Sequence, residues 1–200
     1  IKLVNQASAA NNEGNFVAAK KAASKATRMD PEVPEAWYQL GFAQAELGEK
    51  KHALRSLEEA RVRVLNSADA QNSIGLAMLN LGAYQEAERC FVLAVNLRPD
   101  FAFAHSNLGK LCEAQKRMQD AEAYFKKALH FDPELAPAHA NLGAVLVAQG
   151  LDKAAEAACR TAIELDAGLS DAWSNLGNSL VGQRKYSSAI EYFTRAMQLN

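Results

Sequence analysis

The feature that most constrains this chain is an internal repeat with a period of 34 residues. Glycine recurs at that interval five times, and Ala7 extends the series by one step. The glycines are Gly41, Gly75, Gly109, Gly143 and Gly177. Two further series consist of alanine alone: Ala19, Ala53, Ala87, Ala121, Ala155 and Ala189, and then Ala26, Ala60, Ala94, Ala128, Ala162 and Ala196. Since three columns of small residues stay in phase without an insertion, we predict a tandem array of similar units.

The spacing of apolar residues predicts two helices in each unit. In the unit that starts at Ala102, the first helix is expected over about 103–114 and the second over about 120–131. Counting Ala102 as position 1, the first helix presents a core stripe at positions 4, 7, 8 and 11. The stripe of the second helix is Ala121, Phe125, Ala128 and Leu129. Glycine or alanine at positions 8, 20 and 27 would let the two helices approach closely.

The composition supports an all-α chain. Alanine, the best helix former, accounts for 39 of the 200 residues, against 11 glycines and 5 prolines. Apolar residues make up 49% of the chain, and the net charge of −1 leaves no basic excess. The three widely spaced cysteines (Cys90, Cys112 and Cys159) exclude a disulfide framework, so we expect reduced, packed thiols. No apolar run approaches the roughly 18 residues of a membrane span.

Turn and helix-end signals also recur. Glycines at position 15, namely Gly14, Gly48, Gly82 and Gly150, are expected to mark the turn inside a unit. A proline often closes the second helix, because the residue before proline is pushed out of the helical region. The second unit departs from this pattern, since its residues 61–65 read Arg-Val-Arg-Val-Leu with no proline. Its second helix can therefore run on or shift register.

These columns resemble the tetratricopeptide repeat family over the whole chain. The family pattern has Trp, Leu, Gly, Tyr, Gly, Ala, Phe, Ala and Pro at positions 4, 7, 8, 11, 15, 20, 24, 27 and 32. The sixth unit matches it with Trp173, Leu176, Gly177, Ala189, Phe193 and Ala196. Position 24 departs from it as Ala23 and Cys159 in the first and fifth units. The resemblance implies an all-α superhelical solenoid of six helix-turn-helix repeats, at about 1–33, 34–67, 68–101, 102–135, 136–169 and 170–200.

The resemblance also implies that the first helix of each repeat lines an inner, concave surface. Helix geometry turns positions 2, 6, 9 and 13 away from the core, with positions 5 and 12 beside them. Position 6 is neutral and polar throughout, so its side chains can match the N–H and C=O groups of an extended peptide. The candidate peptide-binding residues are Asn5, Gln39, Phe42, Ser73, Leu76, Leu79, Phe103, Asn107, Lys110, Asn141, Asn175 and Asn178. The alternative is that position 6 serves solvation or hydrogen bonds between helices.

An asparagine column of this kind is similar to the repeat arm of the O-linked N-acetylglucosamine transferases. The similar segments are 104–109 (Ala-His-Ser-Asn-Leu-Gly) and 138–143 (Ala-His-Ala-Asn-Leu-Gly). In that family the column holds substrate peptides for a separate catalytic domain, as the resemblance implies. Two functions therefore stay open. The chain is a protein–protein interaction scaffold that binds a polypeptide segment in its groove, or the substrate-recognition arm of a larger enzyme such as a protein glycosyltransferase.

Other ligands are not indicated. Position 5 holds no lysine and no repeat has a basic pair at positions 2 and 6, unlike the repeat modules that clamp chaperone C-termini. His105 and His139 have no column of Cys or carboxylate beside them to complete a metal site. Glu35, Asp69 and Asp171 oppose a single groove lysine, which argues against nucleic acid. No nucleotide-binding, serine-nucleophile or zinc-protease motif occurs, so we expect no catalytic residue, metal or cofactor.

The two ends of the sequence indicate a cut array. Ile1 stands at position 2 of a repeat and Asn200 at position 31, with no polar capping element at either end. The last helix would expose Ile190, Phe193 and Met197, a face that another repeat, a domain or a second subunit would cover. We expect a single array from a longer protein, with self-association through uncapped ends as a further option. The expected compartment is the cytoplasm, or the periplasm if the parent carries a signal.

Overall fold

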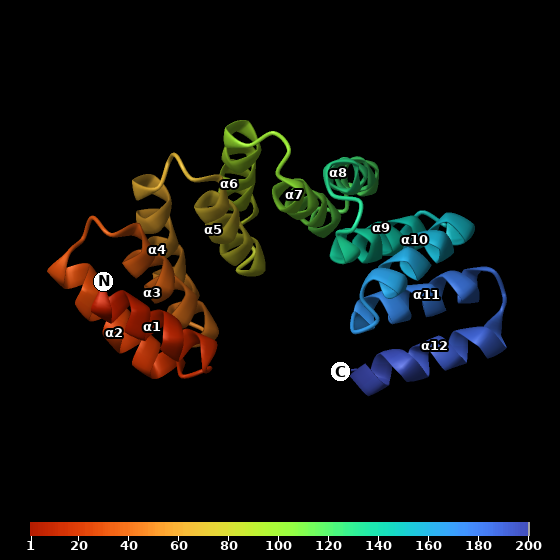
Figure 1. Cartoon of the computed structure of the whole chain (residues 1–200), viewed down its shortest axis with the longest axis horizontal. Coiled ribbons are helices and arrows are strands. Elements are labelled where there is room, and N and C mark those ends of the chain that lie inside the picture. The colour runs from red at the N-terminus through yellow and green to blue at the C-terminus, as the bar shows by residue number, and fades with distance from the viewer. Residues whose placement is uncertain (200) are drawn as a thin grey trace. The chain divides into compact units, whose positions relative to one another are not determined.

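The computed structural model describes residues 1–199, which contain α-helices and no strand; residue 200 lies outside the described residues. The helices pair into six helix-turn-helix repeats, which confirms the predicted all-α fold (Figure 1). The chain divides into two compact units, 1–99 and 100 onwards. Unit 1 holds α1 (Lys2–Asn12), α2 (Phe16–Met29), α3 (Pro34–Glu46), α4 (Lys50–Arg63), α5 (Ala68–Asn80) and α6 (Tyr84–Leu97). Unit 2 holds α7 (Ala102–Ala114), α8 (Met118–Phe131), α9 (Ala136–Ala148), α10 (Asp152–Leu165), α11 (Ser170–Gly182) and α12 (Tyr186–Leu199).

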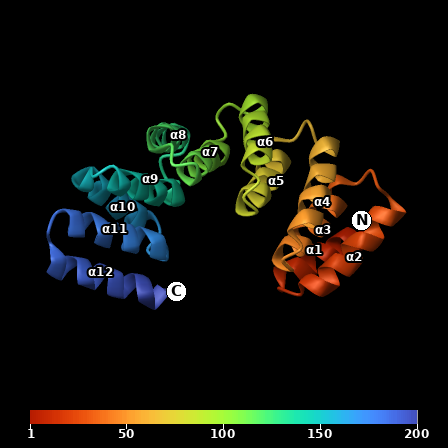
Figure 2. The same cartoon turned by 180° about the vertical axis from the view of Figure 1, so that it is seen from behind.

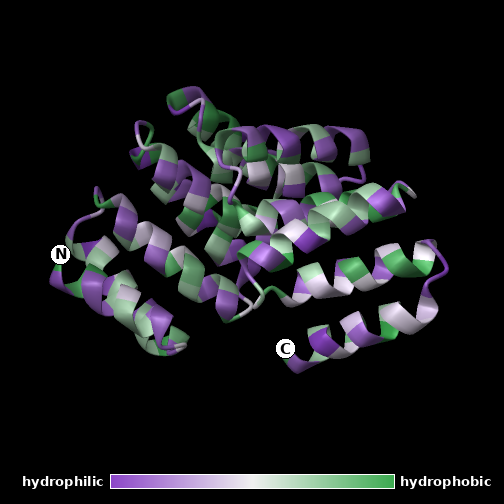
Figure 3. Cartoon of the chain, turned by 45° about the vertical axis from the view of Figure 1, so that its right-hand side comes forward, coloured by the Kyte–Doolittle hydropathy of each residue, from purple (hydrophilic) through white to green (hydrophobic). Residues whose placement is uncertain are grey.

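Within each unit the helices stack as successive antiparallel pairs. In unit 2 the order α9, α10, α11 and α12 can be followed from either side of the molecule (Figures 1 and 2). Most helices carry both apolar and polar residues and bury their apolar side in the stack (Figure 3), whereas α9 is apolar almost all round. The first helix of a repeat also packs on the second helix of the preceding repeat, as α3 does on α2 and α11 on α10.

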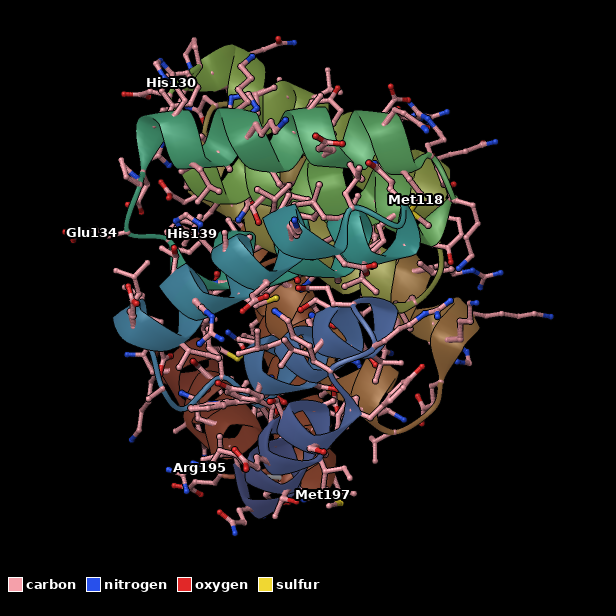
Figure 4. The ribbon with its side chains drawn as sticks, turned by 90° about the vertical axis from the view of Figure 1, so that its right-hand side faces the viewer. Met118, His130, Glu134, His139, Arg195 and Met197 are labelled. Atoms are coloured by element: carbon pink, nitrogen blue, oxygen red, sulfur yellow. The ribbon has the colours of Figure 1, made fainter. Side chains whose placement is uncertain are left out.

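The two helices of a repeat meet at a glycine of the first and a large side chain of the second. A Cβ atom at Gly109 would lie 2.6 Å from Cε1 of Phe125, and Gly177 stands in the same relation to Phe193. The alanines at positions 20 and 27 are buried in all six repeats. The predicted close approach of the helices is therefore confirmed. In α12, Phe193 is half-buried over its glycine, whereas Ile190 is 65% and Met197 is 70% exposed. Figure 4 shows Met197 at the outer edge of the molecule.

The predicted thiol environment is confirmed, since all three cysteines are free and buried. Cys90 lies on the inner side of α6, and its thiol sulfur is 3.9 Å from the sulfur of Met78. Burial raises the pKa of Cys90 and of Cys159 to about 12. Both thiols therefore stay protonated and unreactive at neutral pH.

The turn inside each repeat uses one backbone conformation at position 15. Gly14, Gly48, Gly82 and Gly150 adopt φ values from +72 to +75°, as the sequence predicts. Lys116 and Arg184 hold the same position in the fourth and sixth repeats, at φ 64° and 62°. The next backbone N–H then bonds back to the first helix, as Arg117 N does to Cys112 O at 2.8 Å. Lys116 and Arg184 therefore adopt this turn conformation with steric strain that glycine would not have.

In the second, fifth and sixth repeats, a side chain at position 4 ties the first helix to the turn before it. Trp37 Nε1 donates to the carbonyl of Pro31 at 2.8 Å, and Trp173 Nε1 to that of Ala167 at 2.9 Å. His139 Nε2 lies 2.8 Å from the carbonyl oxygen of Pro133, beside the turn that carries Glu134 (Figure 4). The position-4 bond therefore fixes where the first helix starts relative to the end of the preceding repeat.

The second repeat, which lacks the closing proline, still ends its helix in register. α4 stops at Arg63, so the alternative that it runs on or shifts is wrong. Gln71 occupies position 4 of the next repeat and is fully buried. Its Nε2 donates to the carbonyls of Arg61 and Val64, both at 3.1 Å. These two bonds satisfy carbonyl groups at the helix end, which replaces the missing proline signal.

Replacing Lys116 with glycine should stabilise the protein. The left-handed conformation costs a residue with a Cβ atom about 1 kcal/mol, and glycine removes that cost. Glycine also loses more conformational entropy on folding, but this offsets only part of the stabilisation. We expect Lys116→Gly to raise the free energy of unfolding by up to about 1 kcal/mol, measured by urea denaturation. Lys127→Gly, in the exposed interior of α8, should lower it by about 1 kcal/mol. A loss of stability in both variants would contradict the strain at position 116.

Replacing Gln71 with leucine should destabilise the junction between the second and third repeats. Leucine has a similar size but cannot donate to the two carbonyls, so the Val64 carbonyl would lose its bond from Gln71 and the Arg61 carbonyl would keep only the bond from Val64 N at 3.3 Å. Oε1 of Gln71 is buried without a partner among the described residues, so its removal offsets part of the loss. We expect the free energy of unfolding to fall by about 1 kcal/mol, whereas Gln85→Leu on the exposed side of α6 should leave it nearly unchanged. Equal stabilities would show that the cap is dispensable.

Candidate functional site

The position-6 column of unit 1 is unevenly buried. Asn5 on α1 is exposed, Ser73 on α5 is half-buried, and Gln39 on α3 is 8% exposed. Gln39 is held by its neighbours: Asn11 Nδ2 donates to its Oε1 at 2.7 Å and to its backbone carbonyl at 3.1 Å. Gln39 Nε2 in turn donates to Oε1 of Glu35 at 2.6 Å. At Gln39 the column therefore links α1 to α3, the helix-to-helix role that the sequence left open.

The column of unit 2 lies at the seam between neighbouring first helices. Asn107 on α7 is buried, and Asn141 on α9 and Asn175 on α11 are half-buried. Asn175 Nδ2 donates to the backbone carbonyl of Ala140 at 3.2 Å, which joins α11 to α9. The amide of Asn175 thus has a structural partner, and for the other members of the column contact with a peptide stays a prediction.

The remaining candidate residues differ in how far they reach the surface. Phe42, Leu76 and Leu79 are half-buried on α3 and α5, and the Phe42 ring packs edge-to-face on Phe16 at 6.4 Å. On unit 2, Phe103 is 54% exposed, and Lys110 on α7 and Asn178 on α11 are exposed. The first helices α7 and α11 therefore leave both apolar and polar groups uncovered.

A cavity of about 460 Å³ opens between α3 and α5 in unit 1. Ser73 is the only predicted site residue on its wall. The other lining residues are Pro34, Glu35, Tyr38, Val64, Ala70 and Ile74. Sequence reasoning missed Tyr38, although a signal existed: it is the one aromatic side chain at position 5, where the other repeats have Val4, Asn72, Ser106, Ala140 and Ser174.

Burial and charge both act on the phenol of Tyr38. Burial raises its pKa above the ordinary value of 10.0, and the nearby carboxylate of Glu35 raises it further. The two causes are distinct but act in the same direction, since each makes the phenolate less stable relative to the neutral phenol. Glu35 and Tyr38 both line the cavity, less than one helical turn apart on α3, so the carboxylate lies close enough to act on the phenol.

The described residues show no group of three His, Cys, Asp or Glu side chains arranged to hold a metal ion. Of the helices described, none combines the length and the apolar character that crossing a membrane requires. The chemistry that the candidate surface presents is thus that of neutral amides, apolar side chains and isolated charges.

Family models match the sequence in every repeat. Models described as tetratricopeptide repeat match residues 4–53, 68–101, 102–135, 136–168 and 170–200. No curated protein matches the chain in sequence. The matched segments follow the 34-residue period that was read from the glycine and alanine columns.

Several solved structures share the fold. The structure of PilF from Pseudomonas aeruginosa has a TM-score of 0.79 at 18% identity, over 99% of this chain and 90% of that chain. MamA 41-end from Desulfovibrio magneticus RS-1 has a TM-score of 0.66 at 25% identity, over 83% and 94%. YrrB, described as a TPR protein with an unusual peptide-binding site, has a TM-score of 0.59 at 20% identity, over 91% and 94%. At such identities PilF and YrrB bear on the fold alone.

The pKa of Tyr38 provides a test of the geometry of the cavity. We expect its phenol to titrate above pH 10.0, followed by the ¹³C shift of the ring carbon that bears the hydroxyl. Glu35→Gln should lower this pKa because a negative charge that opposes ionisation is removed, yet burial should keep it above 10.0. Glu46→Gln, at the other end of α3, should leave it unchanged. A Tyr38 pKa that does not respond to Glu35→Gln would contradict the described proximity.

Proposed function

This chain belongs to the tetratricopeptide repeat family, and on that basis we propose that it binds an extended polypeptide segment along the first helices of its repeats. The repeats and the fold that they share with solved TPR proteins support the broader role of a protein-interaction scaffold. YrrB, whose fold is similar, is described as having a peptide-binding site, which is consistent with the finer proposal.

The observation that carries the proposal is the mixed, uncovered surface of the first helices. Phe103 is 54% exposed, although a phenylalanine gains about 2 kcal/mol when its side chain is removed from water. Asn141, on the first helix α9 of the next repeat, is half-buried and carries both a donor and an acceptor. An extended peptide has alternating N–H and C=O groups and side chains that project to either side, so it can use both kinds of group.

A fixed surface favours such binding. The Asn11–Gln39–Glu35 hydrogen bonds hold three side chains of unit 1 in place, and the bond from Asn175 to α9 fixes part of the surface of unit 2. Side chains that are already ordered lose little conformational entropy when a ligand docks, so more of the contact energy appears as affinity.

The proposal is tested with peptides selected on the intact chain from a random library of short sequences. Asn141→Ala removes an amide that has no structural hydrogen bond among the described residues, and Phe103→Ala removes an exposed ring. We expect Asn141→Ala to weaken the selected peptides about fivefold, the equivalent of one net hydrogen bond. Phe103→Ala should weaken them by about tenfold or more, because the ring would be buried by the peptide. Affinities are measured by isothermal titration calorimetry.

The matched control is Gln119→Ala, which removes an exposed amide from the second helix α8. Its affinities and the helical circular dichroism of all variants should equal those of the unmodified chain. Selected peptides that bind the two first-helix variants as tightly as the control would place the binding surface elsewhere and refute the proposal.

A further inference from the structure

The cavity between α3 and α5 has apolar walls and one charged group. Pro34, Val64, Ala70 and Ile74 form the apolar part, and the Tyr38 ring lies among them. Glu35 is the only charged residue that lines the cavity, and it is exposed to solvent. A cavity of about 460 Å³ can hold one long side chain of a bound peptide together with solvent at its mouth.

The carboxylate of Glu35 lacks a cationic partner within residues 1–199. The arginine nearest in sequence to the cavity wall, Arg63, pairs instead with Glu32 and Glu59 and lies over the Trp37 ring at 5.6 Å. Most carboxylates that form ion pairs in this chain do so at the second helices or turns. Glu35 therefore leaves an uncompensated negative charge beside an apolar cavity.

Hydrogen bonds keep this carboxylate in position. Gln39 Nε2 donates to Oε1 of Glu35 at 2.6 Å, and Gln39 is itself held by Asn11 at 2.7 Å. Gln39 lies one helical turn after Glu35 on α3, so the bond restricts the rotation of the Glu35 side chain. Its second oxygen, Oε2, has no hydrogen bond among the described residues and remains able to accept one from a ligand.

We propose that this cavity selects a lysine or arginine side chain of the bound polypeptide, with the aliphatic stem against Ile74 and Val64 and the cationic tip at Glu35. The inference rests on the proposed peptide-binding function and adds a specificity to it. Lys and Arg bury their methylene stems on apolar surfaces and keep the charged head near water, which is the distribution that this cavity presents. The Tyr38 ring also lines the cavity, and an aromatic ring can give the same cation a second favourable contact.

Other side chains fit the cavity less well. An acidic side chain would meet the Glu35 carboxylate with like charge, and an apolar one would leave that carboxylate partly desolvated without a partner. Burial is the larger cause of the raised pKa of Tyr38, and the negative charge of Glu35 adds to it. A second cavity, between α4 and α6, does not show this preference. Its lining includes three cations and three carboxylates, which balance one another: Lys50, Arg55, Arg89, Glu58, Glu59 and Glu86.

The test uses the peptides selected on the intact chain, aligned to find positions that favour one residue type. We expect lysine or arginine to recur at one position. A selected peptide is then compared with a version whose basic residue is replaced by norleucine, which keeps the stem and removes the charge. Glu35→Gln keeps an oxygen acceptor for Gln39 but loses the charge. It should weaken the basic peptide about fivefold, as expected for a partly exposed ion pair, and leave the norleucine peptide unaffected.

Glu13→Gln is the control, since it removes the same charge from an exposed turn of the same unit and should change neither affinity. Peptides without a recurrent basic residue, or a Glu35→Gln effect that is absent or equal for both peptides, would overturn the inference. If such peptides still lose affinity with Asn141→Ala, the proposed peptide-binding function stands. A library that yields no binding peptide would contradict both proposals.

Discussion

The close approach of a glycine on the first helix to a side chain on the second is the contact on which five of the six repeats depend. In five repeats a residue at position 24 packs directly over the glycine at position 8, as Leu57 does over Gly41 and Phe91 over Gly75. The added methyl group of an alanine would overlap these side chains, so glycine is required by the packing. The first repeat confirms the logic in reverse, because Ala23 replaces the large residue there and Ala7 replaces the glycine.

This contact sets the rest of the geometry within a unit. Once the two helices of a repeat are fixed, the left-handed residue at position 15 and the position-4 bond to the preceding turn determine where the next first helix begins. Neighbouring first helices then lie near enough for Asn175 to bond to the backbone of α9 and for Asn11 to bond to Gln39. The amide column therefore stands where neighbouring first helices meet, and Gln39 and Asn175 use it for hydrogen bonds between those helices.

The sequence predicted the features that repeat and missed those that occur once. The period, the paired helices and the small-residue contacts follow from columns of six, in which each repeat reinforces the others. Helix periodicity also gave the outward direction of position 6, but it could not show that Gln39 is 8% exposed. Gln39 is buried because Asn11 on the neighbouring helix α1 packs against it, and the distance between α1 and α3 cannot be read from the sequence. The Gln71 cap was missed for the same reason, since its carbonyl partners lie 7 and 10 residues earlier in the chain.

The proposed specificity site lies at the junction where the second repeat departs from the pattern by lacking a closing proline. Val64 directly follows α4, at the position that precedes the closing proline in the first, third and fourth repeats. Its carbonyl accepts a hydrogen bond from Gln71, and the residue also lines the cavity. In unit 1, α5 packs less extensively on α4 than α3 does on α2, which leaves room for the cavity. A regular array presents similar grooves at every junction and discriminates poorly between ligands. The second repeat departs from the pattern, yet α4 ends in register, so this junction can differ from its neighbours while the helices still stack. Recognition of a particular side chain requires such a difference between junctions.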